Sequence, residues 1–170
     1  MAITMHSASV PVFVRMLQNM NTWLDKAVAH AEAKKFDPSV YLAARLAPDM
    51  LPFSRQIQIA TDNAKGCVAR LAGVEIPKYE DNEATIDELR ERIRKTVDFI
   101  QSVPADKFEG SETREVEIPR RTGEPLRFKG EAYLKHFALP NVFFHVTTAY
   151  ALLRHNGVDL GKADYIGPAA

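Results

Sequence analysis

The segment EAYLKHFALPNVFFHVTTAYALLRHNG, residues 131–157, decides the fold class that the sequence predicts. Its apolar side chains recur at the spacing of an α-helix, so one face of that helix is directed inward. That face consists of Leu134, Ala138, Asn141, His145, Ala149 and Leu152. Pro140 is predicted to kink the helix, because its ring removes one backbone hydrogen bond, and Gly157 is predicted to end it. The segment therefore predicts a kinked helix whose buried face carries two polar side chains.

Two further helices with the same periodicity are predicted in the first half of the chain. The first extends over about residues 9–34, and its apolar face consists of Phe13, Leu17, Met20, Leu24, Ala27 and Ala31. The second begins near Asp49, with Pro52 in its first turn, where a missing backbone N–H is tolerated. It ends at Gly73, a residue suited to a left-handed cap. A short helix is expected between the two, over residues 40–46.

A third helix begins at a capping box, in which Thr85 and Glu88 each satisfy a backbone N–H of the first turn. Glu88 and Arg92 are expected to form an ion pair on the solvent-exposed side. Between residues 111 and 130 the pattern changes from helical to alternating, which predicts a small β-hairpin. Together these elements predict an all-α fold, an antiparallel four-helix bundle with the hairpin before the last helix, in a single domain over residues 1–170.

The amino-acid composition argues against several classes of function. Lys plus Arg and Asp plus Glu number 22 each, so the formal net charge is +0, which argues against a broad nucleic-acid surface. Cys67 is the only cysteine, so no disulfide can form within the chain. The N-terminal residues lack the pattern of a signal peptide, and no apolar run approaches the roughly 20 residues that span a bilayer. We therefore expect a cytoplasmic protein without nucleic-acid or membrane partners.

His145 is the candidate functional side chain, because it places an imidazole in an otherwise apolar face. Asn141 lies one turn before it, Thr148 lies nearby, and Gln56 of the second helix is the first choice for its hydrogen-bond partner. One interpretation is a core histidine satisfied by one or two hydrogen bonds. The other is a ligand-binding or acid–base group in a cavity, since helix bundles place their sites on facing helices. In either case, burial should keep the ring neutral at pH 7.

The other reactive side chains are expected to be structural or solvated. Cys67 lies on an apolar helix face with no basic neighbour apparent from its own helix, which is typical of a buried thiol rather than a nucleophile. Surface positions are predicted for the remaining histidines, His6, His30, His136 and His155. The sequence contains no phosphate loop, no HExxH and no CxxC pair.

The order of these elements, with LRHNG at residues 153–157, resembles the DinB-like superfamily, a class associated with metal-dependent enzymes that include thiol-dependent transferases and isomerases. The stretches RLAPDM, ARLAG, PNVFFHVTTAYALLRHNG and GKADYIG are similar to a branch with no assigned activity. The resemblance implies the four-helix bundle and a homodimer. Members often carry H-x-x-x-H in the final helix, followed by L-R-x-x-G, and a third histidine in the second helix.

The resemblance also locates the metal-ligand positions of the superfamily in this chain. His145 matches the second histidine of the final helix, whereas Asn141 occupies the position of the first. The second helix has no histidine, and Gln56 or Gln58 is the nearest candidate there. One of three ligands remains, and an amide oxygen is a poor ligand for Zn or Ni. We therefore expect a degenerate triad, no bound metal and no cofactor.

Three functions stay open, and the sequence does not decide whether the chain is an enzyme. The first is a small-molecule pocket around His145, the best candidate for a catalytic group, with Gln56, Asn141 and Thr148 as ligand-binding residues. The alternative is a non-catalytic dimeric bundle that acts through partner binding. Apolar contact for such a homodimer is expected from Val12, Met16 and Trp23. The second alternative is a metal- and thiol-dependent transferase or isomerase.

Overall fold

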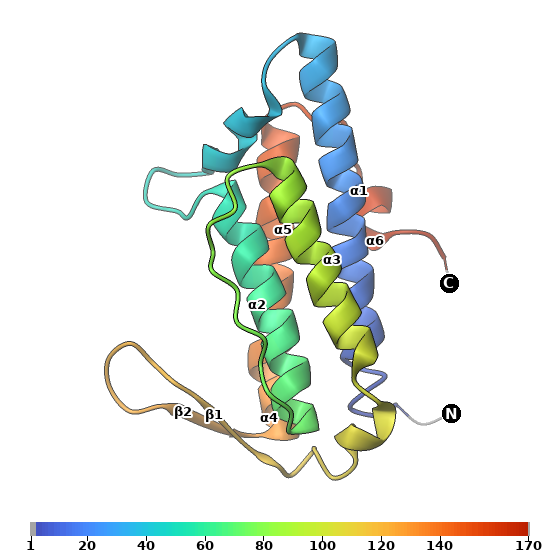
Figure 1. The fold of residues 1–170 in the computed structure, drawn as a ribbon, viewed down its shortest axis with the longest axis vertical. Helices are drawn as coiled ribbons and strands as arrows, with labels where there is room; N and C mark the ends of the chain where they lie inside the picture. Colours follow the sequence, from blue (N-terminus) through green and yellow to red (C-terminus); the bar gives the residue numbers. More distant parts are fainter. Residues whose placement is uncertain (1–2, 170) are drawn as a thin grey trace.

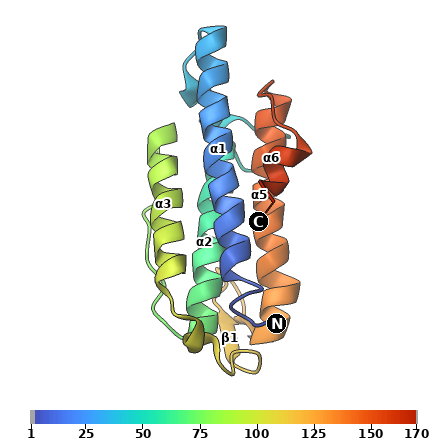
Figure 2. The ribbon, with the colours of Figure 1, turned by 90° about the vertical axis from the view of Figure 1, so that its right-hand side faces the viewer.

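Four long helices packed side by side form the body of the structure, a computed structural model that describes residues 3–169 (Figures 1 and 2). They are α1, Val10–Lys34; α2, Phe53–Ala72; α3, Ile86–Ser102; and α5, Leu139–His155. Both α1 and α2 pack against α3 and α5. The pairs α1–α3 and α2–α5 are antiparallel (Figure 1). The predicted all-α class, a four-helix bundle with a small hairpin before the last helix, is confirmed.

The connector between α2 and α3 runs back along the bundle, so that these two helices point in the same direction (Figure 1). Gly73 begins it in the left-handed conformation expected of the cap, with φ 68°. Its last residue is the cap of α3, where Thr85 accepts from the backbone N–H of Glu88 and the Glu88 carboxylate accepts from that of Thr85. The predicted capping box is confirmed. Because the connector is long, it covers part of the α2–α3 surface.

The second helix begins at Phe53, four residues later than the sequence predicted from Asp49. Pro52 is its N-cap, with an extended backbone at ψ 167°. The proline ring disfavours the helical conformation for the residue before it, so the helix cannot extend upstream through Leu51. The short helix between α1 and α2 is a 3₁₀ helix, η1, Pro38–Ala43.

The last helix contains an irregular turn next to Pro140. It begins as α4, Gly130–Tyr133, continues as a π-helical turn, η3, Leu134–Ala138, and then becomes α5. The backbone stays in the right-handed helical region from one segment to the next. A π turn accommodates one extra residue, and it lies where the proline lacks an N–H to complete the regular ladder. The helix therefore accommodates Pro140 with a wider π turn next to the position where the sequence predicted a kink.

The hairpin consists of β1, Glu115–Ile118, and β2, Leu126–Lys129, which are antiparallel with Val116 opposite Phe128. Its base packs on the last helix, because Val116 is buried and Phe128 contacts the rings of Tyr133 and Phe137. Its tip extends away from the bundle (Figure 1). The short 3₁₀ helix η2, Ala105–Phe108, connects α3 to it. Only the base of the predicted hairpin therefore lies against helices.

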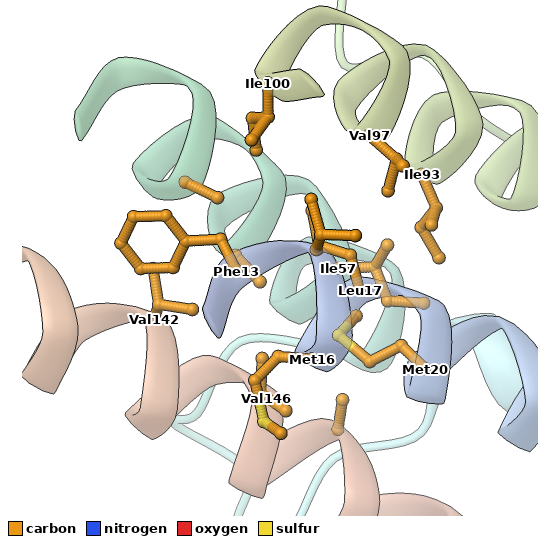
Figure 3. Close-up of a cluster of buried hydrophobic side chains, with 14 of the residues drawn as sticks. Phe13, Met16, Leu17, Met20, Ile57, Ile93, Val97, Ile100, Val142 and Val146 are labelled. Atoms are coloured by element: carbon orange, nitrogen blue, oxygen red, sulfur yellow. The ribbon is translucent and has the colours of Figure 1, made fainter. Parts of the chain in front are cut away.

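Apolar side chains from all four long helices meet in the core (Figure 3). They include Phe13, Leu17 and Met20 of α1, Ile57 of α2, Ile93, Val97 and Ile100 of α3, and Val142 and Val146 of α5. Burial of one such large side chain contributes about 1.5–3 kcal/mol. The core thus fixes the rotation of each helix and decides which polar positions point inward. No helix in the described part of the chain is both long and apolar enough to cross a membrane.

The C-terminal segment folds back over α1 and α5, with a short helix α6, Lys162–Ile166 (Figure 2). Trp23 donates its indole N–H to the carbonyl of Asp164 at 3.0 Å and stacks on Tyr165. Met16 and Trp23, expected as exposed contacts of a homodimer, are in fact buried. That expectation was wrong for two reasons. Met16 belongs to the core between the helices (Figure 3), and the C-terminal segment, which helical periodicity cannot locate, covers Trp23.

Candidate functional site

His145 lies in the middle of α5 and faces the first turn of α2. Only 9% of the residue is exposed, and Gln56 opposite it is 2% exposed. The Nδ1 atom of His145 lies 2.8 Å from Oε1 of Gln56. Both the burial of the imidazole and its predicted partner are confirmed. The structure also decides between the two glutamines, because Gln58 bonds Arg55 and Glu83 instead.

The amide of Gln56 fixes the tautomer of the imidazole. Its Nε2 donates to the backbone carbonyl of Leu51 at 2.9 Å, so its oxygen is the atom that faces His145. A carbonyl oxygen only accepts hydrogen bonds, and therefore Nδ1 of His145 carries the proton and donates. In the neutral ring the other nitrogen, Nε2, then bears a free lone pair. No group among the described residues hydrogen-bonds that nitrogen.

Burial lowers the pKa of His145 below its ordinary value of 6.5, because desolvation penalises the charged imidazolium. No carboxylate bonds the ring to offset this effect. The neutral form therefore predominates at pH 7, as expected from the sequence. A neutral imidazole with one free nitrogen is a good hydrogen-bond acceptor and a general base.

Asn141 and Thr148 flank His145 on the same helix. Each donates a hydrogen bond to a backbone carbonyl of α5 or of the π turn before it. Nδ2 of Asn141 donates to the carbonyl of Phe137 at 3.1 Å, and Oγ1 of Thr148 donates to the carbonyl of Phe144 at 2.7 Å. Thr148 is buried and Asn141 is half-buried. Gln56, Asn141, His145 and Thr148 are called the His145 site below. The acceptor oxygens of Asn141 and Thr148 have no partner among the described residues.

An open groove of about 500 Å³ lies beside this site, between α5 and the loop that precedes α2. It is lined by Leu46, Met50, Pro140, Phe143, Phe144, Thr147, Thr148 and Ala151. Thr148 belongs to both the site and the groove, and the ring of Phe144 meets that of His145 edge to face at 5.1 Å between centroids. The lining residues include no charged side chain. Of the four side chains of the site, only Thr148 lines the groove, whose apolar surface includes Phe144, 57% exposed.

The donor set of the His145 site does not fit the metal centre that the superfamily resemblance implies. It offers one imidazole nitrogen and neutral amides, and the oxygen of Gln56 already accepts from Nδ1 of His145. Zn and Ni sites use several imidazole, thiolate or carboxylate ligands, and an amide oxygen is a weak substitute. Over residues 3–169, no three His, Cys, Asp or Glu side chains are grouped so as to hold a metal ion.

A second polar cluster, missed from the sequence, surrounds Arg92 between α2, α3 and their connector. The Arg92 side chain is 1% exposed, although it was expected on the solvent side with Glu88. Its guanidinium bonds Asp62 at 2.7 Å and Glu83 at 2.8 Å, and it lies 2.8 Å from Asp81. The expectation was wrong because the connector covers this face of α3 and brings Asp81 and Glu83 to the arginine. Arg55 pairs with Asp81 and Lys65 pairs with Asp62, so the three acidic groups are matched by three basic ones.

Two other sequence expectations have different outcomes. Cys67 is buried, and burial raises the pKa of its thiol, so it is a structural side chain as predicted. His30, predicted at the surface, is half-buried, and its Nδ1 lies 2.6 Å from the hydroxyl of Tyr41. That contact was missed because η1 folds back onto the end of α1, which the periodicity of α1 does not reveal.

Comparison with known proteins places this arrangement in a class. The structure is similar to the crystal structure of a DinB family member from Shewanella denitrificans, with a TM-score of 0.90 and 43% sequence identity. The likeness covers 96% of this chain and 92% of that one. The fold is thus that of the DinB-like helical bundles, as the resemblance implied.

Within this class, the chain belongs to the family described as Domain of unknown function (DUF1993), whose model matches residues 5–166. No curated protein sequence matches the chain. The family assignment therefore establishes the fold, and the function has to be inferred from the side chains of the site.

Proposed function

We propose that this protein binds a small molecule at the His145 site, without a metal ion. The observation that carries the proposal is the free Nε2 of His145, which the Gln56–Leu51 chain of hydrogen bonds holds in one tautomer. Nε2 has no protein partner among the described residues and is not fully buried, so a ligand can reach it. The adjoining groove of about 500 Å³ offers an apolar surface of the size that small ligands occupy.

His145 is the group of the site that can take up a proton near neutral pH, since the other three side chains do not titrate in that range. Gln56 acts on it as a positioning residue. It orients the ring and keeps the proton on Nδ1, in the way that a second hydrogen-bond partner orients a functional histidine. The chemistry available is therefore hydrogen-bond acceptance or proton abstraction by Nε2.

The test uses protein with ¹³C-labelled histidine rings, titrated with three ring-sized probes: phenol, anisole and benzoate. At least one of them should shift the ring resonance of His145 in a saturable manner, while that of His155, exposed at the end of α5, stays unchanged. The same titration of His145→Phe should show no saturable change in the protein spectrum around the site. If none of the three probes shifts His145, the proposal is wrong.

A second candidate function is self-association or partner binding through the groove. Exposed apolar side chains gather on and near it, and these are Leu46, Leu51, Phe143 and Phe144. Contiguous apolar surface of this kind often marks an interface. Under this alternative, Phe144→Ser should shift the protein toward monomer in light scattering, whereas Ile166→Ser, exposed on α6, should not. A monomer mass for the unaltered protein at all concentrations would exclude a homodimer.

A further inference from the structure

We infer that the His145 site selects a neutral ligand whose apolar body carries an O–H or N–H donor, and that it discriminates against carboxylates and phosphates. This inference rests on the proposed function and names the chemistry of its ligand. Its basis is the number of donors and acceptors that the protein leaves unused at the site.

The first unused group is Nε2 of His145, and it can only accept. The proton of the ring is on Nδ1, where the oxygen of Gln56 receives it at 2.8 Å. That assignment follows from the second bond of the same amide, to the carbonyl of Leu51 at 2.9 Å. If the amide were reversed, two oxygens would face each other at Leu51. The imidazole therefore presents a lone pair to a ligand and no hydrogen.

The second unused group lies one turn further along α5. Thr148 has a single hydroxyl hydrogen, which it donates to the carbonyl of Phe144 at 2.7 Å. Its oxygen keeps a free lone pair, so Thr148 too can only accept. Because residues three apart lie on one face of a helix, the side chains that carry the two acceptors are neighbours. Thr148 is also part of the groove wall, which places this acceptor at the edge of the apolar surface.

The surroundings of these two acceptors disfavour an anion. The groove that contains Thr148 has apolar and hydroxyl-bearing walls, and its lining residues carry no charge. The donors an anion would need are used within the protein, and burial of an unpaired charge is costly. A neutral ligand with one donor instead forms a bond to Nε2 or Oγ1 and covers the exposed ring of Phe144 with its apolar body.

Phenol and anisole provide a matched pair, because they share a ring and an oxygen but only phenol has a donor. Affinity is measured from the ring resonance of His145 in the labelled protein, with benzoate as the anionic probe. Phenol should bind about tenfold or more tightly than anisole, the effect of one hydrogen bond to Nε2 or Oγ1, and more tightly than benzoate by at least the same factor.

Thr148→Val supplies a nearly isosteric variant without the acceptor. It should weaken phenol binding several-fold and leave anisole unchanged. Thr22→Val is the matched control, because Thr22 is exposed on α1, away from the groove, and its hydroxyl likewise donates to a backbone carbonyl of its own helix, that of Asn19. It should leave both affinities unchanged.

The outcomes separate the inference from the proposed function. Anisole or benzoate binding at His145 as tightly as phenol would overturn the donor inference and leave a small-molecule site in place. Equal loss of phenol and anisole affinity in Thr148→Val would also contradict it, since a shape effect would then explain the change. Failure of all three probes to shift His145 would overturn the proposed function itself.

Discussion

The Nδ1 atom of His145 lies 2.8 Å from Oε1 of Gln56, although 89 residues separate the two in the sequence. This bond ties the middle of α5 to the first turn of α2. Because Leu51 holds the amide of Gln56 from its other side, the ring has one orientation and one tautomer. His145 is therefore a packed side chain of the bundle that also keeps one nitrogen free. The two interpretations of this residue that the sequence left open are compatible with each other.

The first prediction concerns the protonation of His145. Desolvation lowers its pKa, so in an NMR titration the ring should titrate below 6.5, the ordinary value. Its pKa is lower in the folded than in the unfolded state, so the unfolded state binds more protons between the two values. Stability should therefore rise with pH through this window and fall as the pH drops below about 6.5. A pKa at or above that value would contradict the buried, neutral assignment.

Gln56→Glu provides the opposite case. A carboxylate at the same hydrogen-bond distance should stabilise the imidazolium and raise the pKa of His145 by about 1 unit or more. His155 serves as the internal control, since it is exposed at the far end of α5 and should titrate alike in both proteins. An unchanged pKa of His145 in this variant would mean that the two side chains are not paired in solution.

The second prediction separates binding from folding at the same pair. His145→Gln keeps an N–H that can reach Gln56, so it should change the free energy of unfolding by no more than about 1 kcal/mol while abolishing phenol binding. Gln56→Leu leaves the buried N–H of His145 unpaired and should cost about 1–3 kcal/mol. Urea denaturation and the phenol titration give the two quantities. A large loss of stability in His145→Gln with unaltered binding would identify a purely structural histidine.

The third prediction concerns the buried arginine. Arg92→Met removes the charge that pairs with Asp62, Asp81 and Glu83, and it should lower the free energy of unfolding by about 3–5 kcal/mol. The matched control is Arg94→Met, on the same helix, whose side chain is 60% exposed while paired with Glu91 and Asp98. It should leave the free energy of unfolding nearly unchanged, because exposed ion pairs contribute little. Similar effects of the two substitutions, measured by chemical denaturation, would contradict the burial of Arg92.

The fourth prediction concerns metal binding. Elemental analysis of untagged protein should find no stoichiometric transition metal, because the donor set of the His145 site is one imidazole and neutral amides. The double variant Gln56→His with Asn141→His places three imidazoles at the same positions and should acquire Zn²⁺ affinity in a calorimetric titration. About one Zn, Ni or Fe per unaltered chain, lost in His145→Ala, would show that the amides suffice as ligands.

The fifth prediction uses the only tryptophan of the chain as a reporter of the C-terminal segment. Trp23 is 1% exposed beneath the stacked ring of Tyr165. Tyr165→Ala should uncover the indole, shift its fluorescence to longer wavelength and increase quenching by iodide. Ile166→Ala, an exposed neighbour on the same short helix, should leave the emission unchanged. Identical spectra for all three proteins would mean that Tyr165 does not cover Trp23 in solution.

Most of the helix ends follow from the sequence, because the signals that set them are local. The capping box at Thr85 and Glu88 and the left-handed Gly73 act over a few residues of backbone, and the structure contains both as predicted. The start of α2 predicted near Asp49 is wrong, because the ring of Pro52 disfavours the helical conformation for the residue before it and α2 begins at Phe53. A local signal for the correct start was therefore present.

The site was predictable in part. The helical wheel placed His145 inward, since the spacing of apolar residues along α5 fixes which face is buried. The same reasoning proposed Gln56 but could not exclude Gln58, because the two lie two residues apart and helix rotation decides which one faces α5. The burial of Arg92 was not predicted, because the residue pattern of α3 does not indicate that residues 74–85 fold over this side chain.

The sequence by itself determined the elements of this protein: the helices, their caps, the hairpin and the inward direction of His145. These depend on hydrogen bonds and periodicities that extend over one or two turns. The tertiary structure alone decided the partners: Gln56 for His145, the acidic residues for Arg92 and the C-terminal segment for Trp23. Each of these contacts joins residues far apart in the chain, and it forms only once core packing has fixed the rotation of the helices and the course of the connectors between them.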